Sequence, residues 1–201
     1  MSEIKRGKYI VFEGGECTGK STQSKMVAER IDAQWVREPG QTPLGAHLRA
    51  IMLDPSIEAT GKSLAFLFAA DRSQVVDEVI EPTTASGRHV VSDRSWRSSY
   101  AYQSAQGVDG ELTVAVNQLA IGSYTEPDLL ILLDGDPEEL AQRRMRDNDR
   151  FENMEFDFHH KVREGLLEIC QGVGAVTIDA TMELEEVTEA IWAAVEPIVG
   201  E

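Results

Sequence analysis

The sequence has little cysteine, no long apolar run and few basic residues. Its two cysteines, Cys17 and Cys170, favour free thiols in a reducing compartment over a disulfide scaffold. No apolar stretch approaches the roughly 18 residues of a membrane span, and residues 1–8 are too polar for a secretory signal. We therefore expect a soluble, cytoplasmic protein without a membrane partner.

The shortage of basic charge limits the partners further. Lysine and arginine total 19 against 35 aspartates and glutamates, which gives a net charge of -16. Nucleic-acid binding needs a broad basic surface, so we expect no nucleic-acid partner. The acidic excess also suggests the hypothesis of a salt-adapted host. A local basic cleft can still concentrate small anions, and many arginines lie in segments that we expect to meet at one site. These are Arg37, Arg49, Arg72, Arg94, Arg97, Arg143, Arg144, Arg146 and Arg150.

The pattern of apolar residues predicts one domain over residues 1–201. No Pro/Gly/Ser-rich linker divides the chain, and 42% hydrophobic residues can fill one sizeable core. Strand-like apolar runs occur at residues 9–12, 35–36, 89–91, 129–133 and 175–178. Helical periodicity occurs at residues 22–31, 44–53, 64–80, 98–105, 111–123, 137–146, 156–171 and 184–199. This alternation predicts a three-layer α/β fold, in which helices cover both faces of a five-stranded parallel sheet. Ligands of such sheets bind beyond the carboxyl ends of the strands.

The segment after the first apolar run fits the phosphate-loop pattern G-x-x-x-x-G-K-[ST] without a gap. Gly14 and Gly19 let backbone N–H groups curl around phosphate oxygens, and Lys20 adds a positive charge. Ser21 offers a hydroxyl to Mg²⁺ on the terminal phosphates. A glycine-rich turn before an ordinary helix is the alternative, but the strand, loop and helix context favours a P-loop NTPase fold. The residues expected to bind the triphosphate are Gly14, Gly15, Glu16, Cys17, Thr18, Gly19, Lys20, Ser21 and Thr22.

Charged residues follow two further strand-like runs. Arg37 and Arg49 flank a Pro-Gly turn and are placed to hold an acceptor phosphate from two sides. Asp93 is expected to hold Mg²⁺ through water, and Arg94 to contact the transferring phosphate. The alternatives are a capped loop with solvated arginines for the first pair and a mutual salt bridge for the second.

Two helical segments carry groups suited to a nucleoside. Phe68 and Arg72 are four residues apart, so they share one helix face and offer a ring beside a planar donor. Taken alone, this pair is better explained as a core aromatic residue beside a surface arginine. Four residues of the second segment offer hydroxyls, a ring and an amide, which suit recognition of a base and a sugar: Ser98, Ser99, Tyr102 and Gln103.

A basic stripe is expected between the fourth and fifth strands. Arg143, Arg146 and Arg150 are spaced by three and four residues, so a continuing helix would align them. Phosphoryl transfer spreads negative charge over the equatorial oxygens, and this stripe is expected to close over it as a lid at residues 143–155. The alternative is a solvated face paired with neighbouring acids. The histidines show no metal-ligand spacing and receive no role.

Together these segments resemble the thymidylate kinase family over nearly the whole chain. The resemblance rests on residues 12–22, Arg37-Glu38-Pro39-Gly40 with Thr42-Pro43 and Arg49, Phe68-Ala69-Ala70-Asp71-Arg72, Asp93-Arg94, Ser98-Ser99 with Ala101-Tyr102-Gln103, Asp149-Arg150-Phe151-Glu152, and Phe158 with Val162-Arg163-Glu164-Gly165. It implies ATP-dependent phosphorylation of thymidine monophosphate with Mg²⁺, in the synthesis of thymidine triphosphate, by a homodimer.

The resemblance also implies individual roles. Phe68 would stack on thymine, Arg72 would bond its exocyclic oxygen, and Tyr102 would crowd the sugar 2′ position. Glu16 matches an acidic residue near the acceptor sugar and the metal. Arg94 would touch both phosphate groups.

The chain departs from the family pattern at Cys17, Gln41, Ala46, Ser95, Arg97 and Ser104. Cys17 takes the position of an arginine that some relatives carry in the loop, so the lid must supply that charge. We expect direct in-line transfer, with Lys20, Arg94 and the lid arginines as catalytic residues. Two alternatives stay open: a kinase for another deoxynucleoside monophosphate, and an inactive nucleotide-binding sensor. A GTPase switch is disfavoured because no Asn-Lys-x-Asp segment occurs.

Overall fold

The computed structural model describes residues 5–122, 126–143 and 149–200. These residues form one sheet of order β2-β3-β1-β4-β5, in which every neighbouring pair is parallel. The strands are β1 (Tyr9–Gly14), β2 (Gln34–Arg37), β3 (Val90–Asp93), β4 (Leu129–Asp134) and β5 (Val176–Asp179). The register places Asp93 beside Phe12 on one side and Arg37 on the other. The expected fold class and all five expected strands are confirmed.

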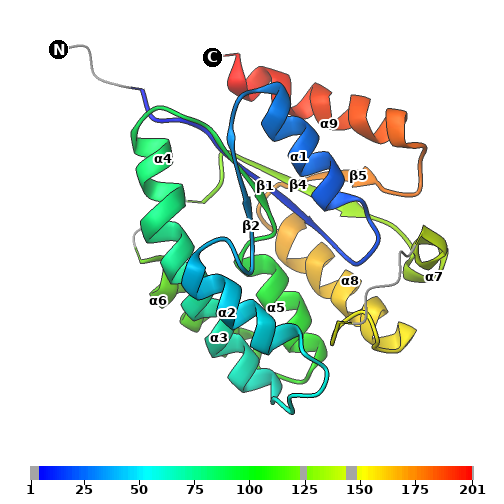
Figure 1. Ribbon diagram of the computed structural model, residues 1–201. Helices are drawn as coiled ribbons and strands as arrows, with labels where there is room; N and C mark the ends of the chain where they lie inside the picture. Colours follow the sequence, from blue (N-terminus) through cyan, green and yellow to red (C-terminus); the bar gives the residue numbers. More distant parts are fainter. Residues whose placement is uncertain (1–4, 123–125, 144–148, 201) are drawn as a thin grey trace.

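Helices cover both faces of this sheet. They are α1 (Lys20–Arg30), α2 (Pro43–Leu53), α3 (Gly61–Val75), α4 (Glu81–Ala85), α5 (Trp96–Ala105), α6 (Gly110–Ile121), α7 (Pro137–Leu140), α8 (Phe156–Gln171) and α9 (Leu184–Val199). A π-helical turn, η1 (Val76–Ile80), joins α3 to α4, and a 3-10 turn, η2 (Ala141–Arg143), follows α7. Figure 1 shows α1 and α9 on one side of the sheet and α5 and α8 on the other. Within the three described ranges, no helix is both long enough and apolar enough to cross a membrane.

The alternation of side chains along β1 explains the two layers. Ile10 and Phe12 enter an apolar core that α1 and α9 share, whereas Tyr9 and Val11 enter a second core with α3, α5 and α8. All six residues of β1 are buried. A strand buried on both faces has a continuous apolar sequence, which is why the apolar runs located the strands.

The structure has one helix that was not expected, α4, and two expected helices differ in extent or type. The helix expected over residues 64–80 is α-helical only to Val75, and its last part is the π-helical turn. The helix expected over residues 137–146 is α-helical only to Leu140. Its start follows the usual capping chemistry, because Asp136 accepts a hydrogen bond from the Glu138 N–H at 2.9 Å, and Pro137 takes the first helical position. The bounds expected for α8 and α9 are confirmed.

A close contact between α5 and α8 positions both helices beside the carboxyl edge. A Cβ atom on Gly165 of α8 would lie 3.1 Å from the Cα of Ala101 on α5. Glycine therefore lets the two backbones approach, and the approach brings Phe158 of α8 within 6.1 Å of the Tyr102 ring. This packing forms one wall of the site described next.

Candidate active site

The loop between β1 and α1 has the backbone that a phosphate-binding nest requires. Gly14, Cys17 and Gly19 have φ angles of 157°, 61° and 82°. A Cβ on Gly14 would lie 2.6 Å from the Leu133 carbonyl oxygen, so no other residue fits there without a shift of the backbone. Lys20 is buried, and its ammonium donates to the Gly15 carbonyl at 2.6 Å. The ammonium thus bridges the loop that is expected to hold the phosphates.

Glu13 fastens this loop to the segment after β3. Its side chain is fully buried and accepts hydrogen bonds from the Ser95 N–H at 2.8 Å, the Ser95 hydroxyl at 2.7 Å and the Ser98 hydroxyl at 2.6 Å. A buried carboxylate is tolerable because these donors replace water. Sequence reasoning missed this role, since its partners lie 82 and 85 residues away in the chain.

Ser21 and Asp93 meet as expected for a metal site. The Ser21 hydroxyl donates to Asp93 Oδ2 at 2.5 Å, while Oδ1 of Asp93 is buried and lacks a partner among the residues described. A hydroxyl beside a carboxylate is the oxygen donor set that Mg²⁺ takes in phosphate sites, where water and substrate supply the other ligands. Among residues 5–122, 126–143 and 149–200, no cluster of three or more His, Cys, Asp or Glu residues could hold a metal ion. The two residues therefore fit a magnesium ion that arrives with a nucleotide.

Arg94 connects the phosphate loop to the cavity. Its backbone has a φ of 80°, which is strained for a residue with a Cβ atom, and its N–H donates to the Phe12 carbonyl at 2.9 Å. The guanidinium donates to Glu16 at 2.7 Å, to Ser98 at 3.0 Å and to the Tyr102 hydroxyl at 3.1 Å. The alternative of an Arg94–Asp93 salt bridge is wrong, because Glu16 is the ion-pair partner.

A cavity of about 250 Å³ opens beyond the carboxyl ends of β1, β2 and β3. Its walls include twelve residues that the sequence assigned to transfer, metal or substrate binding: Glu16, Lys20, Ser21, Arg37, Arg49, Phe68, Arg72, Asp93, Arg94, Ser99, Tyr102 and Gln103. Its walls also include Ser98, which was expected beside the base and sugar, and three residues of the expected lid, Asp149, Phe151 and Glu152. Two further wall residues, Glu38 and Ser95, received no site role from the sequence. Of the nine arginines expected to meet at one site, Arg37, Arg49, Arg72 and Arg94 line this cavity, whereas Arg97, Arg143 and Arg150 do not. Arg144 and Arg146 lie outside the described residues.

Arg72 is a buried cavity residue, so the alternative that placed it on the surface is wrong. Its Nε donates to Glu38 at 2.7 Å, and its Nη1 donates to Ser99 at 3.2 Å and to Asn117. Phe68, one helical turn earlier, is partly buried with its ring 6.2 Å from that of Phe151. A planar donor and an aromatic ring thus share one wall of the cavity.

Gln103 presents an unsatisfied amide in the same cavity. Its side chain is fully buried, and neither Nε2 nor Oε1 has a hydrogen-bond partner in the described part of the chain. A buried amide without partners is costly unless a ligand or water completes its bonds. This amide therefore has the chemistry of a ligand contact.

Comparison with known proteins agrees with this geometry. A family model described as Thymidylate kinase matches residues 12–191. The chain belongs to the thymidylate kinase family. A thymidylate kinase from Deinococcus radiodurans is 37% identical over 202 residues, which cover 96% of this chain and 98% of that relative. One from Rhodopseudomonas palustris (strain BisB18) is 39% identical over 95% of this chain and 89% of the relative. A thymidylate kinase from Halothermothrix orenii is 37% identical over 93% of this chain and 95% of that relative. The chain is thus an enzyme of this family of phosphotransferases.

The basic stripe of this family member is not one helical face. Arg143, at the end of η2, donates to the carbonyls of Thr181 at 2.8 Å and Met182 at 3.2 Å. Arg150 lies in a turn and donates to the carbonyls of Met52 at 2.9 Å and Asp54 at 2.8 Å. The expected continuous helix through both residues is therefore wrong. Arg144 and Arg146 lie outside the described residues, and the catalytic role of the stripe stays a prediction.

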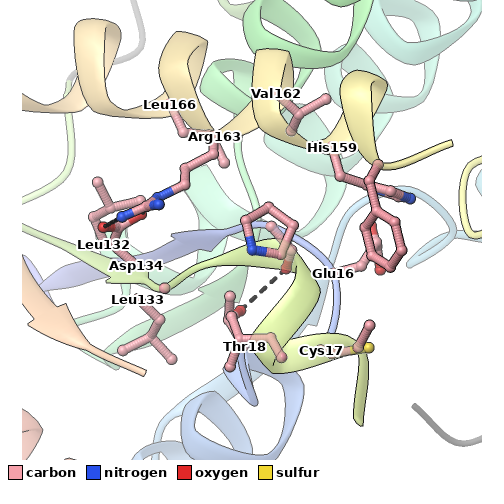
Figure 2. A pocket seen from close by; sticks show the side chains of 16 residues that line it. Glu16, Cys17, Thr18, Leu132, Leu133, Asp134, His159, Val162, Arg163 and Leu166 are labelled. Carbon is pink, nitrogen blue, oxygen red and sulfur yellow. Dashed lines mark hydrogen bonds and ion pairs between the residues drawn. The ribbon is translucent and has the colours of Figure 1, made fainter. Parts of the chain in front are cut away.

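A second, smaller cavity of about 30 Å³ is lined in part by the phosphate loop (Figure 2). Its walls combine loop residues such as Cys17 and Thr18 with apolar side chains of β4 and α8. Figure 2 shows Arg163 extending from α8 toward Asp134, to which its Nε and Nη2 each donate at 2.8 Å. This bidentate pair, which the sequence did not assign to the site, ties α8 to the end of β4 beside the loop.

Proposed function

We propose that this enzyme transfers the γ-phosphoryl group of ATP directly to thymidine monophosphate, which yields thymidine diphosphate for the synthesis of thymidine triphosphate. The single observation that carries the proposal is the set of unpaired polar groups in the large cavity. Arg72 keeps both Nη2 hydrogens without a partner among the described residues, and Gln103 keeps a complete amide.

These groups favour an acceptor base that presents a carbonyl oxygen beside a ring N–H, as thymine and guanine do. An Arg72 N–H can bond only to an acceptor, so the base must present an exocyclic oxygen there. Thymine has such an oxygen beside a ring N–H, and the Gln103 amide offers both an acceptor and a donor for that edge. Cytosine and adenine present amino groups instead, which would leave Arg72 unpaired at a cost of about 1–3 kcal/mol. Phe68 supplies the ring on which the base stacks.

The departures from the family pattern support this acceptor rather than another. Gln41, Ala46, Arg97 and Ser104 do not line the large cavity among the residues described, and Ser95 is a small residue at its wall. Arg97 instead lies buried beside the Trp96 ring and donates to Glu126. The base-reading groups are therefore those of the family resemblance.

Polar and charged residues beyond the carboxyl ends of the strands bind the sugar and the phosphates. Glu16 and Tyr102 are hydrogen-bonded to each other and both line the cavity, which suits recognition of a deoxyribose. Arg37 and Arg49 hold the acceptor phosphate from two sides, and Arg94 lies between the acceptor and the donor. Lys20 and the amides of residues 14–22 bind the donor triphosphate. Ser21 and, through water, Asp93 would hold a Mg²⁺ ion, which would supply positive charge to the phosphate oxygens.

The reaction needs no covalent enzyme intermediate, because positioning and charge neutralisation are sufficient for phosphoryl transfer. Arg143, Arg146 and Arg150 belong to the proposed lid at residues 143–155, which closes over the transferring group. Since Cys17 replaces an arginine in the loop, this segment supplies the additional positive charge. We also propose a homodimer in the cytoplasm. Its supporting observation is that Phe66 on α3 and Leu119 on the neighbouring α6 are 50% and 84% exposed.

The proposal is tested by measuring ADP release with each natural deoxynucleoside monophosphate in turn. Thymidine monophosphate should give the highest kcat/KM. Arg72→Ala should raise its KM more than that of any other acceptor. A preference for another monophosphate would establish the first alternative, and nucleotide binding without turnover would establish the second.

A further inference from the structure

The Arg72 guanidinium is held by residues from three separate segments. Glu38 follows β2, Ser99 lies on α5 and Asn117 lies on α6. A guanidinium has five N–H groups, and the bonds to these residues use Nε–H and both hydrogens of Nη1. The two hydrogens of Nη2 remain for the cavity that Arg72 lines. The direction of these remaining donors is therefore set by the three acceptors.

Asn117 is the acceptor whose own orientation is fixed. Its side chain is 1% exposed, and its Nδ2 donates to the Thr113 carbonyl, one helical turn earlier, at 2.7 Å. With Nδ2 held there, the side-chain oxygen must face Arg72. A flipped amide would place its N–H₂ against the guanidinium and lose both bonds, so only one orientation is stable.

We infer that Asn117 is a positioning residue for recognition of the acceptor base, acting through Arg72. This inference rests on the proposed function. Asn117 does not line the cavity among the residues described, so it touches the substrate only through the arginine that it holds. Without its oxygen, one buried N–H of Arg72 is left unpaired and the guanidinium is free to rotate toward another acceptor. The Nη2 donors then no longer face the base oxygen.

The test compares Asn117→Leu with Asn117→Asp, with Gln118→Leu as the control. Gln118 is the next residue on α6 and is exposed. Asn117→Leu should raise the KM for thymidine monophosphate about tenfold, the loss expected for one hydrogen bond to a charged group. The kcat and the KM for ATP should change less than about twofold in the same variant. Asn117→Asp keeps an acceptor toward Arg72 and should stay within about threefold of wild type. A role in packing alone predicts the reverse order, because leucine keeps the volume while aspartate buries a charge.

A second readout separates positioning from any general damage. An analogue of thymidine monophosphate with hydrogen in place of the exocyclic oxygen at C4 cannot bond to Arg72. Wild type should have a high KM for this analogue, and Asn117→Leu should not raise that KM further. An equal loss on both substrates overturns the inference. If Asn117→Leu does not fold, Asn117→Ser, whose hydroxyl is too short to reach Arg72, replaces it in the same comparison.

Calorimetric titration with thymidine monophosphate keeps the two proposals distinguishable. If wild type binds this nucleotide but transfers no phosphate to it, the proposed kinase activity is wrong and the positioning role of Asn117 is unaffected. An unchanged dissociation constant in Asn117→Leu, relative to Gln118→Leu, would reject the positioning role alone. A dissociation constant raised about tenfold supports it.

Discussion

Arg94 and Glu16 form an ion pair of 2.7 Å that joins the end of β3 to the phosphate loop. Burial raises the pKa of Glu16, but Arg94, Lys20 and the hydrogen bond from Tyr102 together lower it to about 2. The folded value is thus below the unfolded value of 4.5. The pair therefore contributes stability above about pH 4.5 that is lost as the pH falls toward 2.

Removal of the Glu16 charge should reduce the loss of stability at acid pH. For Glu16→Gln, the free energy of unfolding should fall less than that of wild type between about pH 6 and pH 4, by about 1 kcal/mol. Urea unfolding at both pH values measures this difference. Glu29→Gln, at an exposed position of α1, should behave as wild type. Equal acid responses in wild type and Glu16→Gln would contradict the prediction.

Lys20→Ala should abolish turnover and leave the fold intact. The ammonium is the charge that the loop brings to the transferring phosphate, so kcat should fall by at least about a hundredfold. ADP release at saturating substrates measures kcat, and circular dichroism during heating checks the fold. Lys62→Ala, at an exposed position of α3, serves as the matched control. Retained turnover in Lys20→Ala would refute the role of the ammonium.

The acceptor KM should depend on the ionisation of Glu38. Burial raises the pKa of this carboxyl to about 7. The negative charges of Asp71 and Glu13 also raise it, whereas the positive charge of Arg72 lowers it. As the pH falls from about 8 to 6, the carboxylate gains a proton and its bond to Arg72 weakens. The KM for thymidine monophosphate should rise about fivefold through this loss.

Glu38→Gln separates this effect from titration of the substrate phosphate. The variant is neutral at every pH, so its KM should follow the substrate's own titration only. Because the folded pKa of Glu38 lies above its unfolded value, wild type should also lose stability as the pH rises from about 4.5 to 7, and the variant should not. Parallel KM profiles for the two proteins would show that Glu38 does not control Arg72.

Gly45→Ala should disturb the loop that carries Arg37 and Glu38. A Cβ at this position would lie 2.3 Å from Asp71 Oδ1, which accepts the Gly40 N–H at 3.1 Å. Either the helix start or the carboxylate must move, at a cost of about 1–3 kcal/mol. Differential scanning calorimetry should show a lower Tm, accompanied by a higher acceptor KM.

Gly172→Ala is the matched control for this substitution. The nearest atom to its new Cβ would be the Glu168 carbonyl oxygen at 3.5 Å, an ordinary contact. Its φ of -59° suits any residue. A Tm for Gly45→Ala equal to that of the control would mean that the Asp71 contact relaxes without cost.

Added salt should stabilise the protein. A net charge of -16 repels itself in the compact state, and salt screens that repulsion. The Tm should therefore rise as NaCl is added up to about 1 M, where the Debye length is about 3 Å. A Tm that is already maximal without added salt would count against both the prediction and the hypothesis of a salt-adapted host.

The expected strands and most helices follow from local patterns. The run at residues 129–133 is apolar because β4 is buried on both faces, and Asp136 with Pro137 marks the start of α7. Local patterns failed where a helix changes its type without a change of composition, as at Val75, and where arginine spacing suggested a helix that the chain does not form through Arg150.

The sequence by itself determined the parallel sheet and the phosphate loop. Both depend on contiguous residues: runs of buried side chains, and glycines at the positions where the backbone must turn toward an anion. It also indicated that Lys20 and four arginines line one site, namely Arg37, Arg49, Arg72 and Arg94, but it included Arg97, Arg143 and Arg150, which do not line that cavity. Only the tertiary structure decided which groups hold these side chains, because the partners are far apart in the chain. Glu13 with Ser98, Arg94 with Glu16 and Arg72 with Asn117 are separated by 85, 78 and 45 residues. A hydrogen bond needs two atoms about 3 Å apart, and no periodicity within one segment specifies such a distance between segments.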